Sequence, residues 1–422
     1  MAYAIAAVDA IEILDSRSRP TLEVRVTVND SVAVAGVPSG ASTGTREATE
    51  LRDNDPKRFG GAGVTRAVAN VRGEIAELLV GRTLSSLAEL DQLLIDADGT
   101  PTKSRLGANA IVGVSMAAAR AMAQTDGTNL SRWLTPTGVT RRLPVPHFNV
   151  INGGRHAANA LMPQEFMIAP LGAPSFADAL RAGAEIYTAL RGLLHDRGHD
   201  VGLGDEGGFA PNIRTADDAC AVLVEAIEAS GYRQGPDGVA IALDPAASEF
   251  RRPDGRYELI EREPTLSSAS LIDYWADLAE RFPIWSIEDA LAEDDVDGWK
   301  QLTVRLGDRL QLVGDDNLVT NPHIIAEAID GGIANAALIK LNQIGTVTET
   351  LAAMALCRDA GYGQMVSHRS GETDDPFIAD LAVATGCGQL KSGAPARGER
   401  VAKYNRLLAI ETTEPGLPYG LP

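Results

Sequence analysis

The 422-residue sequence has little of three features that mark large classes of protein: cysteine, basic charge and long apolar runs. Its three cysteines, Cys220, Cys357 and Cys387, stand singly without CxxC spacing, which predicts buried thiols rather than disulfides or a zinc site. Lys and Arg number 38 against 57 Asp and Glu, a net charge of −19, which disfavours nucleic acid and anionic membranes as partners because both require a basic footprint. No stretch approaches the roughly 20 apolar residues that span a bilayer, and Asp9 and Glu12 come too early for a signal peptide. We therefore expect a cytoplasmic protein with no nucleic-acid or membrane partner.

The first third of the chain has the pattern of a small α+β domain. Residues 21–28 alternate polar and apolar side chains, and residues 31–37 return after an Asn-Asp turn, which predicts antiparallel strands. Helical patterns follow at 63–79, 84–95 and 108–123. These elements predict an N-terminal α+β domain over residues 1–135, followed by a linker that contains proline and glycine.

Residues 140–422 alternate apolar β-type runs with helical patterns, and each run stops at a polar or ionisable residue. The six runs end at Asp244, Glu288, Asp315, Lys340, His368 and Lys391. Successive ends lie 23 to 44 residues apart, the length of a strand plus a helix in a parallel α/β architecture. Apolar strands buried on both faces favour a (β/α)8-type barrel. The alternative, an open doubly wound sheet, needs a glycine fingerprint after an early strand, and the segment 61–63 lacks the third glycine.

Three of the predicted strands end in carboxylates: Asp244, Glu288 and Asp315. In a barrel the C-terminal strand ends meet at one mouth, where three carboxylates repel one another unless a hard cation lies between them. Ligation by oxygen alone favours Mg²⁺ or Mn²⁺ over Zn²⁺. Each carboxylate alone is better explained as a helix cap or a surface ion pair, but three at successive strand ends favour a metal site.

Lys340 and Lys391 end two further strands. A lysine beside a metal ion has a lowered pKa, which suits it to act as a base, whereas a lysine that stays charged binds an anion. The segment 367–370 places a cation and two hydroxyls at another strand end, as a phosphate or carboxylate site requires. Glu206 lies in a glycine-rich loop that, taken singly, is equally compatible with a surface turn. His156 lies in a flexible loop, where a histidine by itself is more often solvated than catalytic.

The segment 39–44 contains a GxSxG sequence, the nucleophile-elbow pattern of serine hydrolases, with Ser42 as nucleophile. The elbow belongs within a parallel sheet, however, and here the segment follows predicted antiparallel strands. A mobile lid over residues 38–44 at the barrel mouth is the better interpretation.

The sequence closely resembles the enolase family along nearly its whole length. The segments that carry the resemblance are 38–44, 164–170, 204–208, 242–250, 286–289, 313–316, 340–346, 367–373 and 390–397. The resemblance implies an N-terminal α+β domain before an enolase-type barrel whose second strand runs antiparallel. It also implies Mg²⁺-dependent dehydration of 2-phosphoglycerate, a small anionic phospho-acid, to phosphoenolpyruvate. A homodimer or higher homo-oligomer is the implied assembly.

Position by position, the resemblance implies that Lys340 removes the proton α to the substrate carboxylate. Glu206 would then assist departure of the β-hydroxyl as general acid. The implied ligands are Asp244, Glu288 and Asp315 for the first of two Mg²⁺ ions, and Ser42 for the second. The residues implied to bind substrate are His156, Gln164, Glu165, His368, Arg369, Ser370 and Lys391.

Several positions depart from the family pattern, and Arg155 is the departure with the most direct chemical meaning. It stands beside His156 where the family usually has serine. As an extra cation it would suit a more anionic substrate. A paralogue in phosphonate natural-product biosynthesis, similar to carboxyphosphonoenolpyruvate synthases, is therefore an alternative function, although drift of a solvated side chain explains the change as well. A binding or structural protein that retains the fold without catalysis is a third hypothesis, against which the intact Lys340 and Glu206 argue.

Overall fold

A four-stranded antiparallel sheet forms the outer layer of the N-terminal domain in the computed structural model, which describes residues 2–40, 44–260 and 263–422. The strands are β1 (Tyr3–Leu14), β2 (Pro20–Val28), β3 (Ser31–Gly36) and β4 (Thr83–Leu84), in the order β3-β2-β1-β4. The two strands predicted from alternation are β2 and β3. The alternation of β1 is blurred by four alanines, residues with low strand propensity. Ser42 and the centre of the expected lid lie outside the described residues.

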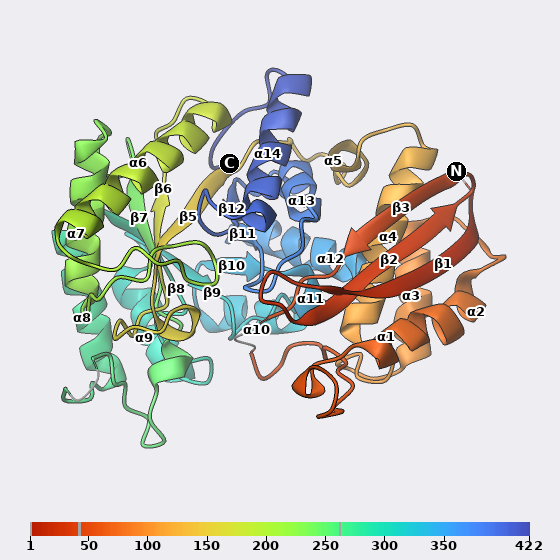
Figure 1. Ribbon diagram of the computed structural model, residues 1–422, viewed down its shortest axis with the longest axis horizontal. Helices are drawn as coiled ribbons and strands as arrows, with labels where there is room; N and C mark the ends of the chain where they lie inside the picture. The colour runs from red at the N-terminus through yellow and green to blue at the C-terminus, as the bar shows by residue number, and fades with distance from the viewer. Residues whose placement is uncertain (1, 41–43, 261–262) are drawn as a thin grey trace.

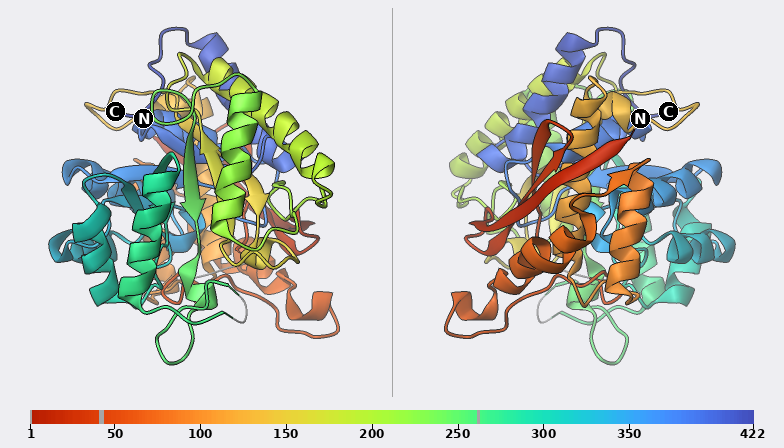
Figure 2. Two further views of the ribbon diagram at one scale, coloured as in Figure 1. Left: turned by 90° about the vertical axis from the view of Figure 1, so that its left-hand side faces the viewer. Right: turned by 90° about the vertical axis from the view of Figure 1, so that its right-hand side faces the viewer.

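Helices cover one face of this sheet (Figure 1). They are α1 (Thr65–Asn70), a π-helical turn (Val71–Ile75), α2 (Ala76–Leu79), α3 (Leu87–Asp98), α4 (Ala108–Thr125) and α5 (Leu130–Trp133). Helix α4 is buried along almost its whole length and packs on β2 and β3, as the right-hand view of Figure 2 shows. Gly113 permits the close approach, because a Cβ at this position would lie 2.5 Å from Val24 Cγ2.

The C-terminal domain is a closed barrel of eight strands within the part of the chain that the structure describes. The strands are β5 (Val145–Asn152), β6 (Glu165–Ala169), β7 (Ala240–Asp244), β8 (Ile284–Glu288), β9 (Gln311–Gly314), β10 (Ala336–Ile339), β11 (Gly363–Ser367) and β12 (Gln389–Lys391). Strand β6, the second of the barrel, pairs antiparallel with both β5 and β7, and the remaining pairs are parallel. The barrel and the reversed second strand are confirmed, and the doubly wound alternative is wrong.

Helices surround the barrel (Figures 1 and 2). They are α6 (Phe176–Asp196), α7 (Ala216–Ala229), α8 (Ser268–Arg281), α9 (Val296–Leu306), α10 (Pro322–Gly331), α11 (Leu341–Ile344), α12 (Val347–Asp359), α13 (Phe377–Thr385) and α14 (Gly398–Thr413). Side-chain caps explain where several begin: the Thr215 hydroxyl accepts from Asp218 N at the start of α7. None of the helices in the described part of the chain is long and apolar enough to cross a membrane.

The reversal of β6 decides which of its residues reach the active end of the barrel. Glu165 is the first residue of β6 and pairs with Asp244, the last residue of β7. The start of β6 therefore lies at the same mouth as the C-terminal ends of the parallel strands. The run that contains Gln164 and Glu165 contributes to the site from its beginning rather than its end.

Side chains of the N-terminal domain form hydrogen bonds with the barrel domain at the start of α12, a few residues after Lys340. Asp91 Oδ2 accepts from Thr348 N at 3.0 Å, and Ser115 Oγ accepts from Val347 N at 3.0 Å. These side chains satisfy backbone donors that the first turn of α12 leaves open. The segment that follows strand β10 is thus fixed by both domains.

Two glycines of α6 make a matched test of the packing between this helix and the barrel. A Cβ at Gly183 would lie 2.3 Å from Phe148 Cε2, whereas a Cβ at the exposed Gly192 meets nothing within 4 Å. We expect Gly183→Ala to lower the free energy of unfolding by about 1–3 kcal/mol through overpacking. Gly192→Ala is expected to raise it by about 0.5–1 kcal/mol through helix propensity. Urea titrations of both variants measure the difference, and shifts of the same sign would contradict this packing.

Candidate active site

The ionisable strand ends meet in one cavity at the mouth of the barrel. The described residues that line this cavity are His156, Gln164, Glu165, Glu206, Asp244, Asp315, Lys340, Ser367, His368, Arg369, Ser370 and Lys391. Glu288 does not line it, but its carboxylate contacts the Lys391 ammonium. The structure therefore brings together the residues singled out in the sequence, apart from Ser42, which falls outside the described residues.

Lys391 lies among three carboxylates, two of which, Asp244 and Glu288, are predicted metal ligands. Its Nζ is 2.9 Å from Asp244 Oδ2, 2.9 Å from Glu288 Oε1 and 3.0 Å from Glu165 Oε2. Burial alone would lower the pKa of Lys391, but these carboxylates raise it well above its usual value. Burial and repulsion by Asp244 raise the pKa of Glu288 well above the ordinary range. One ammonium group thus offsets only part of the negative charge at these strand ends.

Lys340 Nζ contacts Asp315 Oδ2 at 2.5 Å, and Gln343 Nε2 donates to the other oxygen, Asp315 Oδ1, at 2.8 Å. Burial would lower the pKa of Lys340, but the Asp315 carboxylate raises it above its usual value. The expectation of a lowered pKa concerned a lysine beside a bound metal ion, and it stays a prediction for that state. Lys340 can serve as a base only where the charge of Asp315 is offset.

Glu206 lies among three polar side chains, Asn149, His156 and His368, at the mouth. Asn149 Nδ2 donates to its Oε2 at 3.0 Å, and His368 Nε2 lies 3.1 Å from the same oxygen. His156 stands between two carboxylates, with Nδ1 3.6 Å from Glu165 Oε1 and Nε2 3.8 Å from Glu206 Oε1. His156 is buried, so the reading of this residue as a solvated loop histidine is wrong.

Protonation in this group follows from its burial. Burial lowers the pKa of His368 to about 3, with Arg400 adding to the effect, so His368 is neutral at pH 7. Burial and the charge of Glu206 raise the pKa of Glu165 well above its usual value. Burial would raise the pKa of Glu206, but His368 and His156 lower it well below its usual value. Of the two carboxyls beside His156, Glu165 is therefore the one that more readily holds a proton.

Glycines explain how the Glu206 loop reaches the mouth. A Cβ at Gly204 would lie 2.5 Å from Asn152 Oδ1, and one at Gly208 would lie 2.9 Å from the same atom. The loop therefore packs directly on the end of β5 with no room for side chains at these positions. Ala394 N also donates to the carbonyl of Glu206 at 2.9 Å.

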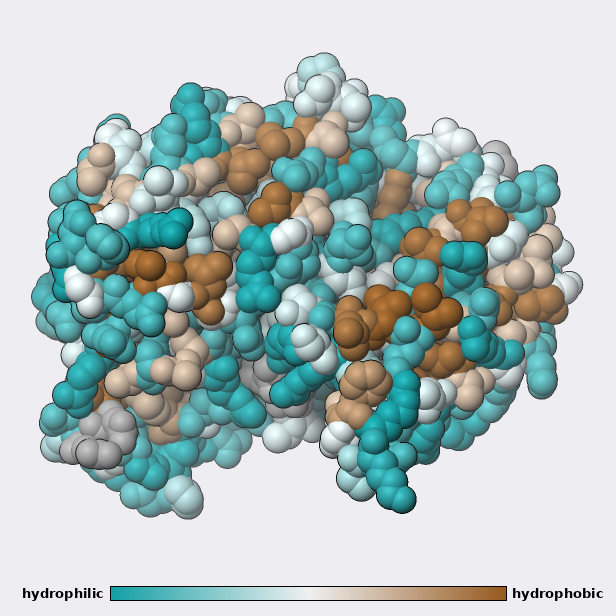
Figure 3. Space-filling model, in the orientation of Figure 1, coloured by the Kyte–Doolittle hydropathy of each residue, from teal (hydrophilic) through white to brown (hydrophobic). Residues whose placement is uncertain are grey.

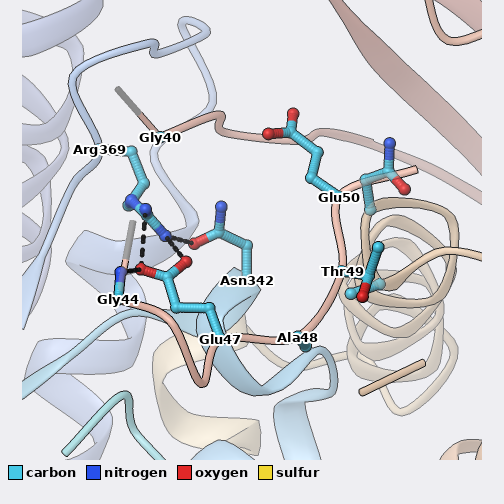
Figure 4. Close-up of a pocket in the computed structure, with 10 residues that line it drawn as sticks. Gly40, Gly44, Glu47, Ala48, Thr49, Glu50, Asn342 and Arg369 are labelled. Carbon is cyan, nitrogen blue, oxygen red and sulfur yellow. Dashed lines mark hydrogen bonds and ion pairs between the residues drawn. The ribbon is translucent and has the colours of Figure 1, made fainter. Parts of the chain in front are cut away.

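Arg369 reaches from the mouth into a second cavity beside the expected lid (Figure 4). Its NH1 donates to Glu47 Oε2 at 2.9 Å and to Asn342 Oδ1 at 2.9 Å. Glu47 Oε1 in turn accepts from Gly44 N at 3.1 Å. The Glu47 carboxylate is thus hydrogen-bonded to the Arg369 guanidinium that is expected to bind phosphate. It also links Arg369 to Gly44, at the end of the expected lid segment.

Sequence reasoning missed several residues that contact the site: Glu47, Asn149, Gln343 and Arg400. Glu47 lies three residues after Gly44, and Gln343 lies three residues after Lys340. Their closeness in sequence to these motifs could have indicated that they contact the site. Asn149 sits in a fully buried strand, where an amide needs a partner, and this was a weaker signal. Nothing in the local pattern of α14 distinguishes Arg400.

Arg155 does not behave as an added anion clamp. Its side chain is 54% exposed, and NH1 donates to Glu249 Oε1 at 3.0 Å and Oε2 at 3.1 Å. Its charge is already paired with a carboxylate at the rim, which agrees with drift of a solvated side chain.

The donor set at the mouth fits a hard divalent cation. Five carboxylates (Glu165, Glu206, Asp244, Glu288 and Asp315) stand against three cations (Lys340, Arg369 and Lys391). Beside them, Asp289, Asp315 and Asp316 offer oxygens within 4.8 Å of one another. Burial and the charge of Asp315 raise the pKa of Asp316 to about 8. An excess of buried oxygen ligands over cations suits a hard divalent cation.

Comparison with known proteins agrees with the geometry. Residues 5–134 match the family model "Enolase, N-terminal domain", and residues 140–415 match "Enolase, C-terminal TIM barrel domain". The chain is 57% identical over 408 residues to the enolase of Rubrobacter xylanophilus, covering 96% of this chain and 94% of the relative. The chain belongs to the enolase family. As a member, it is an enzyme of the carbon–oxygen lyase class. The serine-hydrolase and non-catalytic hypotheses are therefore wrong.

Proposed function

We propose that this enolase-family protein dehydrates 2-phosphoglycerate to phosphoenolpyruvate with Mg²⁺. The observation that carries the proposal is that Lys340, Glu206, Lys391 and Arg369 face one cavity that also holds the carboxylates of the strand ends. A base, an acid and two anion-binding cations in one mouth are what an elimination next to a carboxylate requires.

The difficult step is removal of the proton α to the carboxylate, because the electrons left behind put a second negative charge on that carboxylate. Lys340 Nζ takes this proton in the proposal, and its buried position fixes the nitrogen in one place. The β-hydroxyl then leaves with a proton from Glu206. Stabilisation of the dianionic intermediate is the main demand on the surrounding charges.

The side chains proposed to hold the first Mg²⁺ are Asp244, Glu288 and Asp315, and Ser42 is proposed for the second. When bound, Mg²⁺ would polarise the substrate carboxylate and offset the charge that develops on it. A base with Mg²⁺ is the general pattern of enolase-superfamily sites. The engagement of Asp315 as a ligand would also reduce its hold on the Lys340 ammonium.

The remaining predicted residues are proposed to orient the substrate. Lys391 would bind the substrate carboxylate, and Arg369 with Ser370 would bind phosphate. Because Glu47 contacts the Arg369 guanidinium, binding of phosphate there has to compete with this carboxylate. His156, Gln164, Glu165 and His368 would line the space between these anchors; Gln164 Oε1 is buried without a hydrogen-bond partner among the described residues.

A homodimer in the cytoplasm completes the proposal. The outer face of the N-terminal sheet exposes Ile11, Val32 and Val34, and hydrophobic surface gathers over this sheet in Figure 3. Apolar side chains on a sheet face support association with a second copy. Light scattering tests this by measuring the mass of the particle in solution.

The alternative function, that of a phosphonate-pathway paralogue, receives no support from Arg155, because the charge of Arg155 is paired with Glu249.

The proposal is tested by following phosphoenolpyruvate absorbance with purified protein and 2-phosphoglycerate. We expect turnover on the order of 1–10³ s⁻¹ with Mg²⁺, the usual range for enzymes. Excess EDTA should abolish it, and added Mg²⁺ should restore it. Near-silence on 2-phosphoglycerate in the presence of Mg²⁺ would contradict the proposal and return attention to a more anionic substrate.

A further inference from the structure

Arg400 is a fully buried arginine of α14 that contacts the active-site loops from behind. Its NH1 lies 2.5 Å from His368 Nδ1 and donates to the carbonyl of Arg369 at 2.6 Å. Its NH2 donates to the carbonyl of Ser370 at 2.6 Å. Gly393 makes room for it, because a Cβ there would lie 2.9 Å from Arg400 Cδ. Arg400 does not line the mouth cavity, so any effect on the reaction passes through other residues.

The contact with His368 has one chemical consequence that the backbone contacts lack. A guanidinium has only donors and stays protonated in proteins. The nitrogen that it contacts, Nδ1, must therefore be the acceptor of the imidazole. A neutral imidazole carries its single proton on the other nitrogen, so His368 bears hydrogen on Nε2.

The Nε2–H group is the part of His368 that faces Glu206. Nε2 lies 3.1 Å from Glu206 Oε2, within hydrogen-bonding distance, although the N–H is not aligned for a straight hydrogen bond. With the opposite tautomer, a lone pair on Nε2 would face Glu206 and accept its proton. With this tautomer, His368 can only donate.

We propose that Arg400 is a positioning residue that holds His368 as the Nε2–H tautomer, so that the proton of Glu206 is available to the leaving hydroxyl and not to His368. This inference rests on the proposed role of Glu206 as general acid. It adds Arg400 as a residue that affects Glu206 indirectly, through His368. Arg400 donates to Nδ1 and Nε2–H faces Glu206, so His368 cannot accept the proton that Glu206 delivers to the substrate.

A purely structural role for Arg400 is the competing explanation, because the same guanidinium also ties the carbonyls of Arg369 and Ser370. Three variants separate the two. Arg400→Met removes every donor, while Arg400→Lys keeps a cationic donor behind His368. Arg406→Met is the matched control, since Arg406 lies on the same helix and pairs with Asp380 at 2.6 Å away from the mouth.

Nitrogen-15 NMR of protein labelled at histidine reports the tautomer of each imidazole in the absence of substrate. The His368 signal is assigned as the one of six histidine signals that is lost in the His368→Asn variant. In wild type and Arg406→Met we expect the proton of His368 on Nε2. In Arg400→Met we expect a mixture of tautomers or the Nδ1–H form, and in Arg400→Lys a return toward Nε2–H. A wild-type His368 protonated on Nδ1, or a tautomer unchanged in Arg400→Met, would overturn the proposal even if Arg400→Met loses stability.

Steady-state kinetics supplies the second readout. We expect Arg400→Met to lower kcat at least tenfold with KM for 2-phosphoglycerate nearly unchanged, Arg400→Lys to recover part of kcat, and Arg406→Met to match wild type. A rise in KM without loss of kcat would overturn the link to Glu206. If wild type itself fails to turn over 2-phosphoglycerate while the tautomer responds to Arg400, the proposed function fails and the tautomer assignment stands.

Discussion

Replacing Lys340 with alanine is expected to lower kcat for 2-phosphoglycerate by on the order of 10³-fold or more, close to the full contribution of a positioned base. The physical reason is that no second lysine among the described residues of the cavity lining can substitute, because Lys391 is in contact with Asp244, Glu165 and Glu288. KM should change little, because the base acts on the reacting proton rather than on the anchors of the substrate.

The measurement is steady-state turnover of the variant, with its melting temperature as a check on folding. Lys300→Ala, an equal change of charge on the exposed face of α9, is the control and should behave as wild type. Substantial turnover by a folded Lys340→Ala protein would remove Lys340 from the role of base.

Replacing Glu206 with glutamine is expected to lower kcat by about 10²–10⁴-fold, the range for loss of general acid–base catalysis. The amide keeps the size of the side chain and an oxygen that can accept from Asn149, but it cannot deliver a proton to the leaving hydroxyl. Proton removal by Lys340 should continue, because the two groups act on different bonds. The variant should therefore exchange the α-proton with solvent while forming almost no phosphoenolpyruvate.

Phosphoenolpyruvate formation by Glu206→Gln is measured in the same assay as for Lys340→Ala. Glu249→Gln serves as the matched control, because Glu249 pairs with Arg155 at the rim and is not among the residues that line the cavity. Wild-type turnover in the folded Glu206→Gln protein would remove Glu206 from the elimination step.

The strands of the site were predictable because buried apolar runs that stop at an ionisable residue have a plain periodic signature. Asp244, Glu288, Asp315, Lys340 and Lys391 could be placed at one mouth from that signature and the geometry of barrels alone. The reversal of β6 could not, since a buried strand has the same pattern in either direction. Only the resemblance to the enolase family supplied it.

Contacts between distant segments were beyond the reach of local patterns. The pKa of Lys340 depends on a tertiary contact with Asp315, which no local pattern around Lys340 indicates. Arg155 looked like a free cation because its partner, Glu249, lies 94 residues away. Arg400 illustrates the same limit, because its meaning depends on which nitrogen of His368 it contacts.

Solvent exchange of the α-proton tests the central claim, that Lys340 and Glu206 carry out two separable steps in one mouth. 2-Phosphoglycerate is incubated in deuterium oxide with Mg²⁺ and each variant, and deuterium at the α-carbon of recovered substrate is measured by NMR. We expect Glu206→Gln to incorporate deuterium without net dehydration and Lys340→Ala to incorporate none. Exchange in Lys340→Ala, or its absence in a folded, metal-loaded Glu206→Gln, would contradict the division of roles.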